Sequence, residues 1–201
     1  MTNKIKLAIL ISGNGSNMKS LINDMENPNH PAQPALVISN KVDAQGIKFA
    51  KSKNIKTAIV NPNSFEDQSS CEKEIINLIF SSGASVICLA GFMQILSPEF
   101  VNTFKNCILN IHPSILPLFK GLNTHSKALK SGMIVHGATV HLVTDKVDDG
   151  EILGQGVVPI FKNDNHDSLA NRVLKLEHRL YPLVLRRFLN GNTERTLISD
   201  F

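Results

Sequence analysis

The chain has 201 residues, of which 42% are hydrophobic and 19% charged, and its formal net charge is +4. This composition is typical of a globular protein and excludes a low-complexity or disordered chain. No apolar run approaches the ~20 residues that span a bilayer. The first residues lack the apolar core of a signal peptide, so we expect a cytoplasmic protein.

The cysteines and the cationic residues argue against two further classes of protein. The three cysteines form no C-x-x-C pair, so neither a zinc knuckle nor a redox pair is expected. Lys and Arg are scattered, and with one Tyr and no Trp an aromatic platform for single-stranded nucleic acid would have to rest on Phe alone. We therefore expect no metal, no nucleic acid and no membrane as a partner.

Strand and helix patterns alternate through the first half of the chain. Short apolar runs predict strands at residues 6–11, 35–39, 57–60 and 85–90. Helical spacing of apolar residues predicts helices up to about residue 25, at residues 44–53 and at residues 70–81. The strand at 85–90 is apolar throughout, which is typical of a parallel sheet covered on both faces.

The second half continues this alternation but contains one hairpin. Strands are predicted at residues 107–111, 136–143 and 152–160, and helices at residues 124–131 and about 168–189. The short acidic turn at residues 145–150 joins two consecutive strands, so one late strand should be antiparallel. The sequence therefore predicts the α/β class, as a single-domain, doubly wound and mostly parallel sheet with a late antiparallel strand.

Polar residues stand where three of these strands end. In a doubly wound sheet the ligand lies outside the carboxyl ends of the strands, which here are residues 13–17, 91–96 and 110–113. Asn110 and His112 are two positions apart in a strand and therefore project from the same face. The prolines that follow stiffen the next loop. The alternative is an ordinary histidine beside a turn.

A glycine-rich turn, Gly13-Asn14-Gly15-Ser16-Asn17, leads from the first strand into a helix. Backbone N–H groups at a helix start suit a phosphate. The dinucleotide fingerprint fails because Met18 stands where its third glycine belongs, and a P-loop fails because no Gly-Lys-Ser/Thr follows. A monophosphate cradle and an ordinary tight turn both remain open.

Two carboxylates are candidates for chemistry. Asp148 is the natural partner of His112, because a carboxylate beside an imidazole raises its pKa and lets the pair move a proton near neutral pH. The alternative is a solvated turn that also holds Asp145 and Asp149. Glu177 lies beside the apolar stripe of the last helix with no basic residue at helical spacing, so it either faces water or reaches a ligand.

Four segments together resemble a known family. They are residues 10–17 (LISGNGSN), 90–98 (AGFMQILSP), 110–117 (NIHPSILP) and 136–141 (HGATVH). In this order they resemble the glycinamide ribonucleotide formyltransferases, over residues 6 to about 189. The resemblance implies that residues 1–201 form one domain of the formyltransferase fold. Residues 1–105 would be its Rossmann-like, phosphate-binding half and residues 106–201 its catalytic and folate-binding half.

The resemblance also implies a reaction and a set of residues. The formyl group of 10-formyltetrahydrofolate would pass directly to the amine of glycinamide ribonucleotide, in purine biosynthesis, on a monomer or weak homodimer. Asn110 and His112 would donate hydrogen bonds to the formyl oxygen, and Asp148 would keep His112 protonated. The implied substrate contacts are Gly15, Ser16, Asn17, Pro113 and Glu177. The implied folate contacts are Gln68, Met93, Gln94, Ile95, Leu96, Asn110, Val143 and Thr144.

Three residues depart from the family pattern, and two other readings remain as alternatives. Gln68 and Gln94 stand where the family often has a basic residue, so we expect weaker charge-assisted contact with the folate. Asn123 replaces a histidine that can support the catalytic carboxylate. The length of the chain argues against a methionyl-tRNA formyltransferase and against a formyltetrahydrofolate deformylase. The alternatives are a formyltetrahydrofolate deformylase-like hydrolase and a non-catalytic phosphate-binding module.

Overall fold

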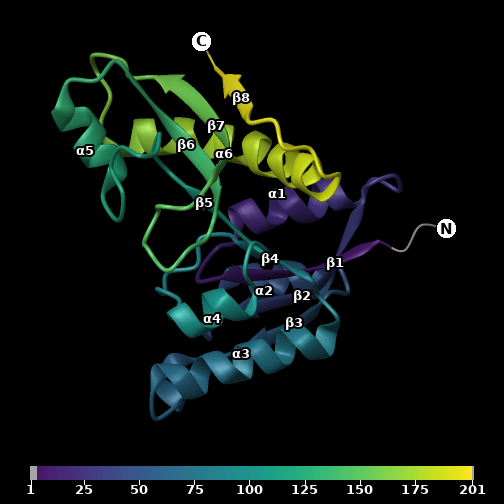
Figure 1. Ribbon diagram of the computed structural model, residues 1–201. Coiled ribbons are helices and arrows are strands. Elements are labelled where there is room, and N and C mark those ends of the chain that lie inside the picture. The colour runs from purple at the N-terminus through teal and green to yellow at the C-terminus, as the bar shows by residue number, and fades with distance from the viewer. Residues whose placement is uncertain (1–3, 201) are drawn as a thin grey trace. The chain divides into compact units, whose positions relative to one another are not determined.

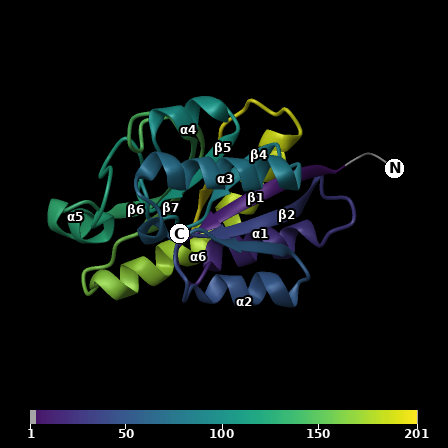
Figure 2. The same cartoon turned by 90° about the horizontal axis from the view of Figure 1, so that it is seen from below.

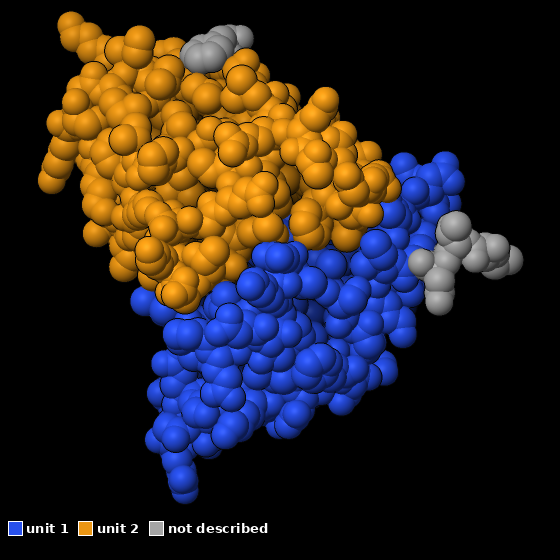
Figure 3. Space-filling model, viewed as in Figure 1, with its two compact units in different colours: residues 1–109 blue, residues 110–201 orange. Residues whose placement is uncertain are grey.

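The computed structural model describes residues 4–200. The chain forms two compact units that divide between Leu109 and Asn110 (Figure 3). The division falls inside strand β5 (Ile108–His112). None of the helices within residues 4–200 has the length and apolar character that a membrane crossing requires.

The first unit is built on parallel strands. Their order is β3 (Lys56–Ile59), β2 (Ala32–Ser39), β1 (Ile5–Ile11) and β4 (Val86–Leu89), and every described pair is parallel. The central strands are apolar along their length because helices cover both faces of this part of the sheet. The core of the unit therefore lies on both sides of β1 and β4.

Helices cover the two faces of this part of the sheet. Helices α1 (Ser16–Met25) and α2 (Gln45–Ser52) lie on one face and α3 (Gln68–Ser82) on the other (Figure 2). This arrangement follows from right-handed crossovers that run first toward one edge of the sheet and then toward the other. A short 3-10 helix, η1 (Pro62–Ser64), precedes α3, and α4 (Pro98–Thr103) follows the loop after β4.

The second unit contains the predicted hairpin. Strands β6 (Val135–Leu142) and β7 (Ile152–Pro159) are antiparallel, and β8 (Thr196–Ser199) pairs with β7 in parallel (Figure 1). Helix α5 (Thr124–Ser131) precedes the hairpin. The long helix α6 (His166–Leu189) packs on β6 and β7. The side chains of its predicted apolar stripe are all buried: Leu169, Val173, Leu176, Leu180 and Val184.

The predicted fold class is confirmed, with differences at particular elements. Strand β2 begins at Ala32, earlier than predicted, and includes Pro34. This proline lies opposite Leu7, where the register of β1 shifts, and a bulge tolerates a residue that lacks an N–H group. The sequence patterns did not predict η1, α4 or β8.

Candidate active site

Four polar side chains meet at the end of β5. Asn110 Nδ2 lies 3.2 Å from Nε2 of His141, and His112 Nδ1 lies 3.3 Å from Oδ2 of Asp148. His141 Nε2 lies 3.6 Å from Oδ1 of Asp148, which joins the two pairs into one chain of contacts. We call Asn110, His112, His141 and Asp148 the β5 cluster. The three residues predicted to be catalytic are therefore brought together.

Asp148 belongs to the interior of the second unit rather than to a solvated turn. Its side chain is only 10% exposed. The N–H of Gly121 donates to Oδ2 at 2.9 Å. Its backbone is left-handed, with φ 50°, which Asp tolerates better than most residues. The neighbouring Asp149 is exposed and pairs with Lys120, and Asp145 is exposed too, so the alternative of a solvated turn holds for these two residues but not for Asp148.

The protonation of the β5 cluster follows from burial and hydrogen bonding. Burial lowers the pKa of His112 below its ordinary value, while the carbonyl of Phe119 and the charge of Asp148 act in the opposite direction. The expectation that Asp148 raises the pKa of His112 above its ordinary value is therefore wrong, because burial has a larger effect on this pKa than the carboxylate has. Burial raises the pKa of Asp148, but hydrogen bonds from His141 and Gly121 outweigh it, so the net pKa is lowered. Asp148 is therefore charged near neutral pH.

The loop after β5 contacts the second nitrogen of the His112 imidazole. His112 Nε2 lies 3.1 Å from the carbonyl oxygen of Phe119. The loop itself is fixed by side chains of the hairpin. Leu116 N–H donates to Oγ1 of Thr139 at 3.0 Å, and Gln155 Nε2 donates to the Leu116 carbonyl at 2.8 Å. The prolines predict a stiff loop, and these hydrogen bonds also attach the loop to β6 and β7.

Sequence reasoning missed three members of this site. His141 joins Asn110 to Asp148, and its Nδ1 lies 2.8 Å from the carbonyl oxygen of Leu142. No spacing in the sequence relates His141 to Asn110, because the contact depends on how the strands pair. Phe119 and Gly121 contribute backbone groups, which leave no signal in the pattern of side chains.

A second group of imidazoles lies in the same unit. His136 Nε2 is 3.2 Å from His125 Nδ1, and the ring of His125 also stacks edge-on against His166. Burial is the main cause that lowers the pKa of both His125 and His136 to about 4. Within residues 4–200, no group of three or more His, Cys, Asp or Glu residues is placed to hold a metal ion.

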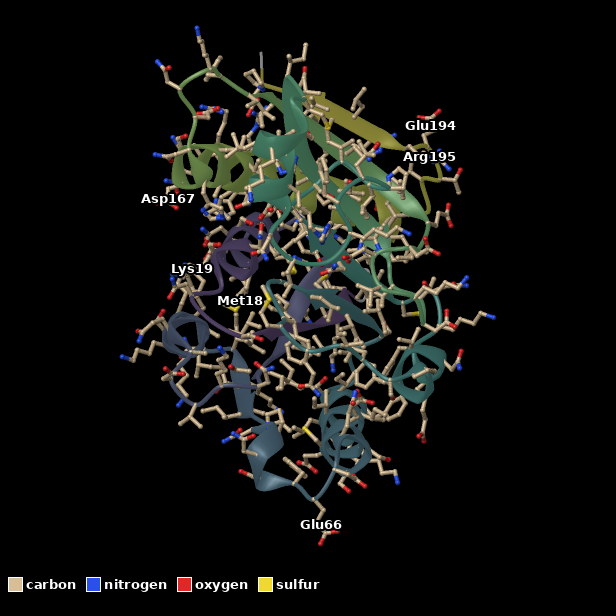
Figure 4. All side chains as sticks on the ribbon, turned by 90° about the vertical axis from the view of Figure 1, so that its left-hand side faces the viewer. Met18, Lys19, Glu66, Asp167, Glu194 and Arg195 are labelled. Atoms are coloured by element: carbon tan, nitrogen blue, oxygen red, sulfur yellow. The ribbon has the colours of Figure 1, made fainter. Side chains whose placement is uncertain are left out.

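The glycine-rich turn forms the start of α1 in the first unit. Gly15 has φ 64°, and a Cβ there would meet Cε of Met18 at 2.9 Å and Cα of Gly46 at 3.2 Å. Figure 4 labels Met18 on this helix. Among the described residues no side chain caps the start of α1, and its first turn holds no acidic residue. A helix start of this kind suits an anion.

The predicted folate residues of the first unit lie on the segment after β4 and at the start of α3. Met93 is 69% and Ile95 71% exposed, whereas the side chain of Leu96 is buried. A cleft of about 380 Å³ lies beside them, and its lining residues are Gln68, Met93, Gln94, Asn40, Pro62, Phe65, Glu66 and Asp67. Glu66 projects outward from the chain just before α3 (Figure 4). Gln68, Met93 and Gln94 are thus brought to one cleft.

The remaining predicted residues lie in the second unit. Glu177 is 6% exposed, so it does not face water. Pro113 directly follows His112 and is half-buried, as is Val143, whereas Thr144 is exposed. Val143 and Thr144 begin the turn that leads to Asp148.

The chain is similar to known proteins over most of its length. Residues 5–185 match the family described as formyl transferase. The phosphoribosylglycinamide formyltransferase of Escherichia coli (strain K12) is 40% identical over 187 residues, which cover 93% of this chain and 88% of that protein. The trifunctional purine biosynthetic protein adenosine-3 of Gallus gallus is 40% identical over 190 residues, and this chain spans 19% of its length.

A solved structure is also similar to this chain over most of its length. The crystal structure of phosphoribosylglycinamide formyltransferase from Brucella melitensis matches with a TM-score of 0.90 and 44% sequence identity. The match covers 94% of this chain and 97% of that chain.

Proposed function

The chain belongs to the formyl transferase family, and we propose that it transfers the formyl group of 10-formyltetrahydrofolate to the amine of glycinamide ribonucleotide. The products are the N-formyl ribonucleotide and tetrahydrofolate, in purine biosynthesis. The observation that carries the proposal is the β5 cluster, where amide and imidazole donors lie beside a charged carboxylate. The chain that holds this cluster resembles phosphoribosylglycinamide formyltransferases over 93% or more of its length.

The transfer is direct. The amine attacks the formyl carbon, and negative charge builds on the formyl oxygen. Asn110 Nδ2 and His112 Nε2 donate hydrogen bonds to that oxygen, and one such donor is worth about 2.7–4 kcal/mol. These donors face His141 and the Phe119 carbonyl in the structure, so the formyl oxygen replaces those partners.

The proton balance involves Asp148. The attacking amine loses one proton and the departing folate nitrogen gains one. Asp148, held by the Gly121 N–H, stabilises the positive charge that the imidazole of His112 gains as the transition state forms, and it helps carry the proton between the two nitrogens.

The ribonucleotide binds through its phosphate and its ribose. The phosphate lies against Gly15, Ser16 and Asn17, a role supported by the uncapped start of α1 within the described residues. Glu177 accepts hydrogen bonds from the ribose hydroxyls, and Pro113 contacts the substrate beside His112.

The folate binds to an apolar surface with backbone groups at its edge. Support comes from the exposed side chains of Met93 and Ile95 and from the cleft that Gln68 and Gln94 line. The complete proposed set is Gln68, Met93, Gln94, Ile95, Leu96, Asn110, Val143 and Thr144.

The protein acts on these small molecules in the cytoplasm, as a monomer or weak homodimer. All four side chains of the β5 cluster come from one chain, so the cluster is complete without a second copy. Sedimentation over a range of protein concentrations measures the oligomeric state, and a stable higher oligomer at all concentrations contradicts this part of the proposal.

A substrate-omission assay tests the reaction. Purified protein is mixed with glycinamide ribonucleotide and 10-formyltetrahydrofolate, and release of the deformylated folate is followed by absorbance. We expect release only when both substrates are present, with the formyl group recovered on the ribonucleotide. Release without the ribonucleotide indicates the deformylase-like hydrolase instead. Binding of the ribonucleotide with no release under any condition indicates a phosphate-binding module.

A further inference from the structure

A carboxylate outside the β5 cluster is buried in the first unit. Glu72 of α3 is 3% exposed. Its Oε1 accepts hydrogen bonds from Gln68 Nε2 at 2.8 Å and from the N–H of Ser97 at 2.9 Å, and its Oε2 accepts from the hydroxyl of Ser97. A buried carboxylate is costly unless donors surround it, and here the donors are neutral groups from two separate segments.

These bonds join the start of α3 to the end of the loop after β4. Gln68 Nε2 also donates to the carbonyl of Ile95 at 2.9 Å. The helix therefore holds the loop at both Ile95 and Ser97. The hydroxyl of Ser97 accepts from the N–H of Phe100 at 3.1 Å and so caps α4. Glu72 thereby fixes the carboxyl end of the loop and the entry into α4.

The amino end of the same loop is fixed independently. The N–H of Met93 donates to Oγ of Ser12 at 2.7 Å, and Ser12 N–H donates to the carbonyl of Gly91 at 3.1 Å. Between the two fixed ends, Met93 and Ile95 expose large apolar side chains. A surface whose backbone is held before a ligand arrives loses less conformational entropy on binding.

We propose that Glu72 is a positioning residue for the folate, because it holds residues 93–97 in the geometry that the folate needs. The inference rests on the proposed folate-binding role of Met93, Ile95 and Leu96. Glu72 does not touch the reacting atoms, and its effect is on folate affinity alone.

The test replaces Glu72 and measures both substrates separately. We expect Glu72→Ala to raise the KM for 10-formyltetrahydrofolate by about tenfold, as loss of one to two hydrogen bonds predicts. The KM for glycinamide ribonucleotide and kcat should stay within about twofold of the wild-type values. The loss of a hydrogen bond would change them by more than this. Glu72→Gln keeps an acceptor for Ser97 and should restore most of the affinity. Glu74→Ala, on the same helix but exposed, is the matched control and should resemble the wild type.

Hydrogen exchange gives a readout that does not depend on activity. In the absence of substrates, the amide of Ser97 should exchange about tenfold faster in Glu72→Ala than in the wild type, because its acceptor is gone. Ser97→Ala removes only the hydroxyl and leaves the buried carboxylate in place. Ser97→Ala should raise the folate KM by about threefold. This variant tests the proposal if Glu72→Ala does not fold.

Several outcomes overturn the assignment. Faster exchange with an unchanged folate KM shows that the loop geometry does not set affinity. A lower kcat in Glu72→Ala with both KM values unchanged shows that Glu72 supports the folded, active enzyme in general and does not set folate affinity. Unchanged exchange at Ser97 shows that Glu72 does not hold the loop. A wild-type protein that binds no folate overturns the proposed function and this assignment together, and the wild-type titration alone identifies that case.

Discussion

The imidazole of His112 lies between two acceptors, Asp148 Oδ2 and the carbonyl oxygen of Phe119. Only a protonated ring donates to both at once. Burial opposes this and lowers the pKa of His112 below its ordinary value. In the proposed reaction, negative charge that develops on the formyl oxygen beside Nε2 would favour the protonated ring. We therefore expect His112 to gain its charge most readily as the transition state forms.

Asp148 gives the first test at the scale of single residues. Asp148→Asn keeps an acceptor for the N–H of Gly121 but removes the charge opposite His112. We expect kcat to fall by about 10²–10⁴, the range of proton-transfer catalysis, while both KM values change little. Steady-state kinetics with varied ribonucleotide and varied folate measure the three constants.

The adjacent carboxylate supplies the control for this variant. Asp149 is exposed and pairs with Lys120, and an exposed ion pair contributes little. Asp149→Asn should therefore keep wild-type kinetics. Equal losses in the two variants would mean that the turn matters as a whole and that Asp148 has no special role.

At the scale of elements, the start of α1 depends on the absence of a side chain at Gly15. A Cβ at this left-handed position would meet Met18 and the backbone of Gly46. The close approach of α1 and α2 therefore sets the residue type, and the helix start, which no described side chain caps, suits an anion. Gly13 stands in the same turn, yet no described heavy atom lies within 4 Å of the Cβ it would gain.

Substitution of the two glycines separates these effects. Gly15→Ala should cost about 1–2 kcal/mol of unfolding free energy, because φ is positive and the space is filled. It should also raise the KM for the ribonucleotide by about tenfold, since the N–H groups move, with little change in the folate KM. Urea unfolding and steady-state kinetics measure both. Gly13→Ala should be close to neutral, and a larger loss in Gly13→Ala than in Gly15→Ala would refute the packing argument.

The sequence patterns predict the long apolar elements well and the short ones poorly. The long helix α6 ends at Leu189, as predicted, and α3 ends at Ser82, one residue beyond the predicted end. The four-residue strand β8 carries too few residues for a period to emerge, and its pairing with β7 is a long-range contact. The short helix α4 begins at Pro98 after a Ser97 cap, a signal that is local and easily missed.

The same distinction applies to the β5 cluster. Residues two apart in a strand predict that Asn110 and His112 share a face, and the structure confirms that they join one network. Whether Asp148 is buried depends on the backbone donor at Gly121, and His141 enters only through strand pairing. The spacing of polar residues in the sequence predicts neither the burial of Asp148 nor the contacts of His141.

At the scale of the whole molecule, buried histidines make stability depend on pH. The pKa values of His125 and His136 are lowered to about 4 in the folded chain, from an ordinary value near 6.5. Between these values the unfolded chain binds more protons than the folded chain. The unfolding free energy therefore falls as the pH falls from about 6.5 to about 4.

Urea unfolding at several pH values checks this expectation. For the wild type we expect a loss on the order of 3 kcal/mol between pH 6.5 and pH 4, after allowance for the partial exposure of His125. His125→Gln removes one of the two groups and relieves the other, so its loss should be smaller by about 1 kcal/mol or more. An identical pH dependence in both proteins would show that other groups control acid unfolding.

Formyl transfer by His112→Ala, with binding of both substrates measured alongside, decides whether the β5 cluster is catalytic. We predict that kcat falls by at least about 10²-fold while both substrates still bind, because the oxyanion donor and the partner of Asp148 are lost together. His166→Ala removes an exposed histidine outside the β5 cluster and should keep wild-type activity. A His112→Ala protein that binds both substrates and transfers the formyl group within about threefold of the wild-type rate would contradict the catalytic role of the β5 cluster.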